Sequence, residues 1–190
     1  MPLALKGATS GQVTIQAPAV AGTNTLTAPA VTGNLLTDVT PGTILQIVNY
    51  QTGALATGTT LIPFDNTIPQ NTEGDQYMSL TITPKSATSK LLINVVFMGG
   101  HSVSSASIAV GLFQDSIANA LAVGWNVISG IGFTNINYSY YMTSGTTSST
   151  TFKVRAGSNS AGTTSFNGYA GAAEYGGTLA SSITITEIAA

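Results

Sequence analysis

Hydrophobic and polar residues alternate along much of the chain after residue 44, which is the pattern of strands that bury one face. Met78, Leu80 and Ile82 fall on one face of such a strand, and Ser and Thr residues fall on the other. Phe152 and Val154 alternate with charged residues in the same way. The pattern predicts antiparallel sheet that is buried on one side.

Ten segments show this alternation or a short apolar run rich in the strand-favouring residues Thr, Val, Ile and Tyr. They are residues 44–50, 59–64, 77–83, 91–98, 108–113, 119–125, 132–143, 150–156, 163–168 and 182–188. Clusters of Gly, Ser and Asn separate them, and residues 115–118 are expected to form a turn. Short strands joined by turns predict an antiparallel β-sandwich, specifically a jelly roll. Ile183 and Ile185 are expected to be buried in its last strand.

The first 37 residues follow a different pattern, an 11-residue repeat in which residues 14–22 are matched by residues 25–33. Prolines within the repeat exclude long helices and central strands. A lone segment of this composition cannot bury enough surface to order itself. We therefore expect residues 1–37 to be an extended arm that docks on another protein or trimerises the chain. Its candidate docking residues are Ile15, Pro18, Val20, Leu26, Pro29 and Val31.

A turn signal with Pro-Gly at its centre separates the arm from the rest of the chain. This predicts a hinge at residues 38–43 and a β-sandwich domain at residues 44–190.

Charged residues make up only 6% of the chain, against about 25% in typical globular proteins. So little charge gives weak repulsion between molecules and favours a chain that works within an assembly. The five basic residues are too few and too scattered for a nucleic-acid-binding groove. No apolar run approaches the roughly 18 residues that would insert in a membrane. The first residues lack the features of a signal peptide, which predicts a product made in the cytoplasm.

Few residues are suited to catalysis, so we expect no enzyme activity and no cofactor. His101 is the single histidine, no G-x-S-x-G motif occurs, and cysteine is absent. The carboxylates Asp65, Glu73 and Asp75 cluster in one loop, which either binds Ca²⁺ or is capped by its own Asx and Thr side chains. The spacing is not that of an EF-hand, and we expect no metal site.

Aromatic residues suggest two surfaces. Tyr169 and Tyr175, in a Gly-rich loop, are candidate ligand-facing residues that offer stacking faces to a sugar ring. Tyr138, Tyr140 and Tyr141 are candidate interface residues: one face of their strand belongs to the core, and the other exposes Tyr141. An aromatic, charge-free outer sheet suits contact between copies, in a trimer packed around an axis. The single tryptophan, Trp125, is expected in the core.

Residues 11–30, followed by Gly33-Asn34-Leu35-Leu36, resemble segments common in bacteriophage tail fibres and related appendage proteins. The larger domain resembles a phage virion module. The matching stretches are residues 67–74, 82–85, 112–115, 119–122, 151–157 and 181–185. The resemblance implies a trimeric virion component exposed on the particle surface, and it transfers no catalytic residues.

The leading functional prediction is a non-enzymatic phage structural protein, a trimeric fibre or fibre tip. Its arm contacts other virion proteins, and its β-domain faces a host surface glycan. An alternative stays open because two repeat units make a poor shaft. In that alternative the protein is a capsid cement or head-decoration protein whose arm lies across capsid subunits. A glycan-degrading enzyme is disfavoured by the sparse carboxylates and single histidine.

Overall fold

The computed structural model describes residues 3–6, 12–15, 40–129 and 132–190, and the chain divides into units of residues 1–37 and 38–190. In the first unit, β1 (Leu3–Lys6) and β2 (Gln12–Ile15) pair in antiparallel fashion. Ile15 is the last residue of β2. The other candidate docking residues lie outside the described residues: Pro18, Val20, Leu26, Pro29 and Val31.

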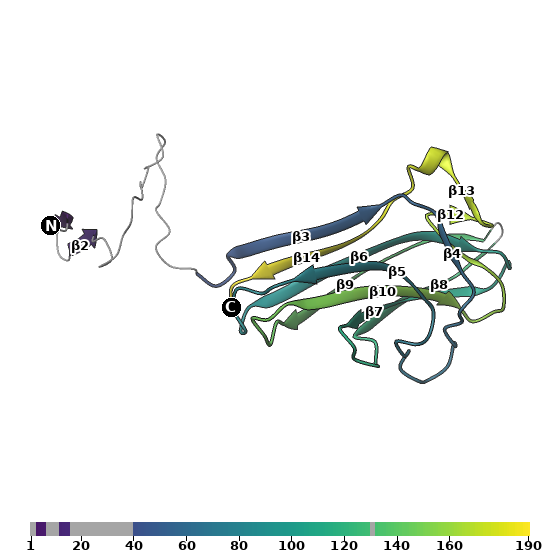
Figure 1. Cartoon of the computed structure of the whole chain (residues 1–190), viewed down its shortest axis with the longest axis horizontal. Coiled ribbons are helices and arrows are strands. Elements are labelled where there is room, and N and C mark those ends of the chain that lie inside the picture. Colours follow the sequence, from purple (N-terminus) through teal and green to yellow (C-terminus); the bar gives the residue numbers. More distant parts are fainter. Residues whose placement is uncertain (1–2, 7–11, 16–39, 130–131) are drawn as a thin grey trace. The chain divides into compact units, whose positions relative to one another are not determined.

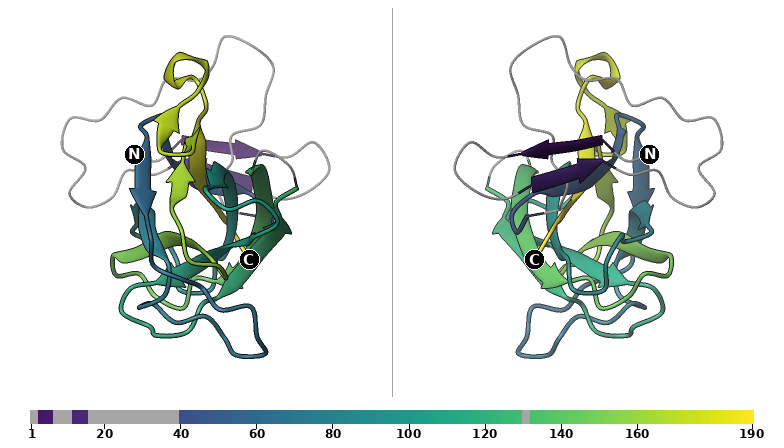
Figure 2. Two further views of the ribbon diagram at one scale, coloured as in Figure 1. Left: turned by 90° about the vertical axis from the view of Figure 1, so that its right-hand side faces the viewer. Right: turned by 90° about the vertical axis from the view of Figure 1, so that its left-hand side faces the viewer.

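Eight strands of the second unit form two facing antiparallel sheets (Figures 1 and 2). The strands of the first sheet, in order, are β3 (Ile44–Thr52), β14 (Ser181–Ile188), β6 (Lys90–His101) and β9 (Phe133–Thr143). Those of the second are β5 (Asp75–Ile82), β10 (Thr150–Ser158), β7 (Ser107–Gln114) and β8 (Ala122–Val127). Each sheet thus mixes strands from both ends of the domain sequence, as in two interlocked Greek keys. The fold is the predicted jelly roll.

Shorter elements extend one end of the first sheet. β11 (Thr164–Phe166) pairs with β6 beyond the start of β14, and β4 (Ala56–Gly58) pairs with β11. The chain then forms a small hairpin of β12 (Gly168–Tyr169) and β13 (Ala172–Ala173), followed by the helical turn η1 (Tyr175–Gly177).

The core lies between the sheets, where every second residue of each strand points inward. Ile183 and Ile185 of β14 are fully buried, as expected. Tyr77 stacks on Phe166 with ring centroids 5.0 Å apart, and Phe97 packs against both rings. Fully burying each aliphatic or aromatic side chain contributes about 1.5–3 kcal/mol.

The strand predicted at residues 59–64 is wrong, because this segment is a loop that follows β4. The Asp75 carboxylate accepts hydrogen bonds from the Thr60 backbone N–H at 2.9 Å and from its hydroxyl at 2.8 Å. Ile62 is buried, and its N–H donates to the carbonyl of Ser158. Side-chain capping and packing from distant residues therefore replace a strand ladder here.

The chain enters the jelly roll at the same end at which it finishes. Gly42 N–H donates to the Ala189 carbonyl at 2.9 Å, and Ala189 N–H donates to the Thr43 carbonyl at 2.8 Å. Ser181, the first residue of β14, lies opposite Thr52, the last residue of β3. β12, β13 and η1 precede β14 and therefore lie at the opposite end of the domain (Figure 1).

Candidate functional site

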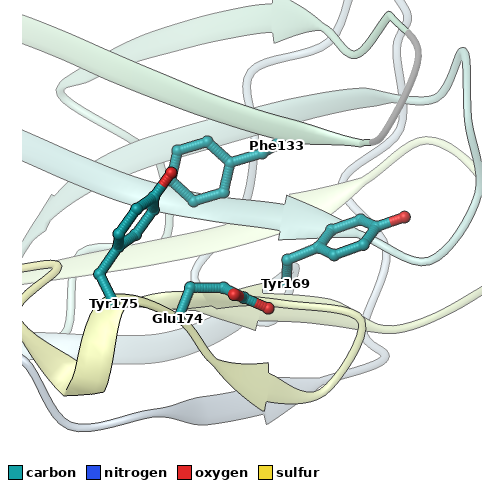
Figure 3. Close-up of a pocket in the computed structure, with 4 residues that line it drawn as sticks. All are labelled: Phe133, Tyr169, Glu174 and Tyr175. Atoms are coloured by element: carbon teal, nitrogen blue, oxygen red, sulfur yellow. The ribbon is translucent and has the colours of Figure 1, made fainter.

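A pocket of about 260 Å³ opens at this far end of the domain, lined by Phe133, Tyr169, Glu174 and Tyr175 (Figure 3). The structure thus brings together Tyr169 and Tyr175, the two residues predicted to face a ligand. Phe133, the first residue of β9, and Glu174, just before η1, were not predicted as site residues. In the view of Figure 3 the Glu174 side chain lies between the two tyrosines, and the Phe133 ring lies above it, beside the ring of Tyr175.

Strand pairing explains how residues so far apart in sequence meet. Phe133 of β9 lies opposite Gly100 of β6, and Phe166 of β11 lies opposite Gly99 on the other edge of the same strand. The chain turns directly after Phe166 into β12, which carries Tyr169. Phe133 therefore had no local sequence signal, since its place depends on the register of β9 against β6.

The Tyr169 ring rests on two glycines. A Cβ atom added at Gly100 would lie 3.2 Å from Cδ2 of Tyr169, and one added at Gly132 would lie 3.2 Å from its Cε2. These distances are shorter than ordinary van der Waals contact, so a larger residue at either position would push the ring. The glycines thus fix one wall of the pocket.

Unusual backbone conformations gather in the segment that carries the pocket. Among the described residues, five non-glycine residues have positive φ, and three of them are Asn167 (54°), Ala170 (48°) and Tyr175 (50°). A positive φ is a genuine outlier for a residue as bulky as tyrosine. Such conformations persist only where the surrounding structure enforces them, and they cluster at ligand sites.

Asn167 shows how the segment is held in place. It is fully buried, and its amide donates to the carbonyl of Thr52 at 2.7 Å and to that of Ala54 at 3.2 Å. Its oxygen accepts a 2.7 Å hydrogen bond from the hydroxyl of Ser181. This network ties the pocket loop to the ends of β3 and β14.

The pocket carries an uncompensated negative charge. Within the described part of the chain, the Glu174 carboxylate has no hydrogen-bond or ion-pair partner. Lys153 instead donates to the carbonyl of Asp115, and Arg155 donates to the carbonyls of Glu73 and Gly74. Lys85 and Lys90 lie near the other end of β14. Glu174 therefore sets the local electrostatic potential beside three aromatic rings.

A second distinctive surface is the outer face of the first sheet. Tyr138 and Tyr140 pack against the core, whereas Tyr141 points outward and is 57% exposed. From the cross-strand row of Ile47, Thr186, Leu92 and Tyr141 toward the pocket end, the outward positions on this face are uncharged, whereas the next row toward the chain entry holds the outward Lys90. The uncharged positions are Ile47, Asn49, Gln51, Leu92, Asn94, Val96, Met98, Asn135, Asn137, Ser139, Tyr141, Ser182, Thr184 and Thr186.

Trp125 was expected in the core, and this prediction is wrong: the side chain is 54% exposed on the outer face of the second sheet. The phase of β8 is set by its inward residue Gly124. A Cβ atom there would lie 2.6 Å from Cδ1 of Tyr138 and 2.7 Å from Cγ2 of Ile136. Only glycine fits at this inward position of β8, because a larger side chain would collide with β9. The tryptophan at the next position, Trp125, therefore faces outward. Its ring centroid lies 5.1 Å from that of Phe64.

The acidic loop is capped by its own residues. Asp65 accepts a 2.7 Å hydrogen bond from the Thr67 backbone, and Glu73 accepts one of 2.9 Å from the Gln70 backbone. The described residues contain no group of three or more His, Asp or Glu side chains placed to hold a metal ion. In the same part of the chain, no helix has the length and apolar character needed to cross a membrane.

Comparison with known proteins assigns no family. No family model matches the chain, and no curated protein sequence matches it either. The resemblance to phage appendage proteins therefore stays a prediction.

Several solved structures are similar in fold at low sequence identity. Eiger TNF from S. frugiperda is 9% identical with a TM-score of 0.41, over 75% of this chain and 93% of that chain. The structure of the infectious bursal disease virus Gt strain is 12% identical with a TM-score of 0.37, over 98% of this chain and 46% of that chain. This chain thus spans about half of the viral one. Because both TM-scores are low, the jelly-roll assignment rests on strand order, and these likenesses carry no functional argument.

Proposed function

We propose that this chain is a non-enzymatic virion structural protein of a bacteriophage, a trimeric fibre or fibre tip that attaches the particle to the host surface. The observation that carries the proposal is the position of the aromatic pocket. It lies at the end of the jelly roll opposite to the end at which residues 40–43 enter.

An attachment module needs its binding pocket and its point of connection to the particle at opposite ends. An arm fixed to another virion protein would hold the entry end of the domain and leave the pocket end facing outward. The eight residues of β14 separate the two ends by roughly 26 Å, at about 3.3 Å per residue. We therefore assign docking and attachment to opposite ends of the sandwich.

The uncharged part of the outer face of the first sheet is the surface we assign to contact between copies. Self-association through the part of this face from Ile47, Leu92 and Tyr141 toward the pocket end, which leaves out Lys90, brings no like charges together, and these three residues supply apolar contact. Trimerisation would present several pockets together, which raises avidity.

A second candidate function is capsid cement, which the short repeat-bearing arm favours. In that case the arm would become ordered by binding across capsid subunits.

Imaging of intact particles with a labelled antibody against the β-domain tests the proposal. Label at the tail, together with reduced infection in the presence of excess free protein, is the expected result. Label on the head without competition would instead support the cement function. Absence of label from purified particles would overturn both virion functions.

A further inference from the structure

We propose that the aromatic pocket binds an N-methylated ammonium group, such as the trimethylammonium of choline, displayed on the target surface. The inference rests on the proposed attachment function for its biological setting, but the binding chemistry depends only on the pocket. It assigns a ligand class to Phe133, Tyr169, Glu174 and Tyr175.

The composition of the lining indicates a cation with apolar substituents. Three aromatic rings supply negative π faces, which attract an ammonium group within about 6 Å of a ring centroid. Glu174 adds a negative charge, and the described residues that line the pocket include no lysine or arginine. Methyl groups on nitrogen spread the positive charge over an apolar surface, which suits aromatic walls better than a strongly hydrated bare ammonium does.

The same lining disfavours the two other ligand classes that exposed aromatics often bind. An anionic ligand would meet the carboxylate of Glu174 and, among the described lining residues, no compensating cation. A neutral sugar could stack on Tyr169 or Tyr175, but its hydroxyl groups would lose water without gaining amide or guanidinium partners from side chains, because none of the described lining residues carries such a group. A glycan bound here is therefore held through a cationic substituent and not through its ring hydroxyls.

Size and rigidity agree with a small ligand. The pocket volume of about 260 Å³ lies just below the range of about 300–1,000 Å³ that is usual for drug-sized ligands. Tyr169 is fixed against Gly100 and Gly132, whereas Tyr175 is 81% exposed at the rim. We infer that Tyr175 loses most of this exposure when a ligand covers its ring.

Titration of the full chain with choline chloride, followed by NMR chemical shifts or calorimetry, tests the proposal. Saturable binding of choline, with weaker binding of ethanolamine and none of glucose, is expected. Tyr175→Ala is expected to weaken choline binding by about 5-fold or more, the loss of one cation–π contact. Glu174→Gln, which keeps shape and removes charge, is expected to weaken choline binding and make it less dependent on salt.

Trp125→Ala is the matched control, because it removes an exposed aromatic ring outside the pocket, and it is expected to leave choline affinity unchanged. Phosphatidylcholine vesicles form a separate arm that distinguishes a lipid headgroup from a free or glycan-borne group. Equal affinity for glucose and choline, or choline binding that Glu174→Gln and Tyr175→Ala both leave intact, would overturn the ligand class. So would a folded protein that shows no choline binding.

These results are independent of particle imaging. A choline-binding protein absent from virions would contradict the proposed function and leave the pocket chemistry standing. A protein that is located at the tail but does not bind choline would support the proposed function and contradict the ligand class.

Discussion

The hydroxyl of Ser89 donates a 2.6 Å hydrogen bond to the buried carboxylate of Glu187, which joins the loop after β5 to the end of the last strand. The backbone N–H groups of Lys85 and Ser86 donate to the same carboxylate oxygen, and the amide of Gln46 donates to the other. Glu187 thus closes the end of the core next to the entry of the chain, with its charge stabilised by dipoles in place of a cation.

Replacement of this carboxylate is expected to destabilise the domain. In the wild type, both carboxylate oxygens of Glu187 accept hydrogen bonds. In Glu187→Gln an NH₂ group takes the place of one of these oxygens, so the buried donors that it faces lose their acceptor. The expected loss in the free energy of unfolding is at least about 2 kcal/mol, measured by urea denaturation. Glu174→Gln makes the same chemical change at a site without hydrogen bonds and is expected to alter stability by less than about 0.5 kcal/mol. Equal effects of the two variants would contradict the structural role of Glu187.

Stability is also expected to fall on acidification, in two separate windows. Burial lowers the pKa of His101 below its ordinary value of 6.5, so the unfolded chain takes up a proton first as the pH falls through that value. Burial opposes ionisation of Glu187, but its hydrogen bonds outweigh this effect and hold its pKa below 4.5. The stability that Glu187 provides is therefore present above about pH 4.5 and is lost below it.

Two variants separate these windows. His101→Gln keeps an acceptor for the Val103 N–H, which donates to Nδ1 of His101 at 3.2 Å, but it cannot be protonated in this range. Unfolding free energies measured from pH 7.5 to 3.5 are expected to lose, in this variant, the slope that begins as the pH falls through about 6.5. Glu187→Gln is expected to lose the slope below about 4.5. An unchanged pH profile in both variants would show that other groups control acid unfolding.

Much of the jelly roll was predictable because burial has a period of two in a strand. The alternation of Met78 with Ser79, or of Ile136 with Asn137, records which face is buried, and the structure confirms both. The failure at residues 59–64 has a different origin. Leu61 and Ile62 are residue types that favour strands. They do not join a strand ladder, because the preceding Thr60 is held by hydrogen bonds to the carboxylate of Asp75, 15 residues further along the chain.

The candidate site was predictable only where its residues share one loop. Tyr169 and Tyr175 lie in the same Gly-rich segment, whereas Phe133 reaches the pocket through the pairing of β9 with β6. Glu174 had one available signal, a carboxylate next to an aromatic residue in a segment without lysine or arginine. Trp125 shows the limit of composition alone, since its direction depends on Gly124 meeting the side chains of β9.

A charge placed in the uncharged part of the outer face of the first sheet is expected to break the proposed trimer. Asn137→Asp is nearly isosteric, and Asn137 is exposed on the outer side of β9. In a trimer that packs through this face, three copies of the charge would be buried close together. Light scattering after size-exclusion chromatography is expected to give three times the chain mass of 19.2 kDa for the wild type and a lower mass for the variant.

Ser79→Asp is the control for this experiment, because it adds the same charge to the outer side of β5 in the other sheet. It is expected to remain trimeric. A monomeric wild type would contradict the trimer. A trimer that Asn137→Asp does not weaken would place the interface elsewhere.

Two glycines allow the pocket wall to be tested apart from simple backbone strain. Gly132 and Gly145 have similar positive φ angles of 72° and 68°, so alanine at either is expected to cost about 1–2 kcal/mol of stability. A Cβ atom at Gly145 would meet nothing within 4 Å, whereas one at Gly132 would lie 2.5 Å from the His101 carbonyl oxygen and 3.2 Å from the Tyr169 ring. Gly132→Ala is therefore expected to cost about 1–3 kcal/mol more than Gly145→Ala in urea denaturation. It is also expected to weaken choline binding, which Gly145→Ala leaves unchanged, because the carbonyl and the ring must both move. Equal stabilities and equal affinities in the two variants would show that the ring of Tyr169 does not depend on this close contact.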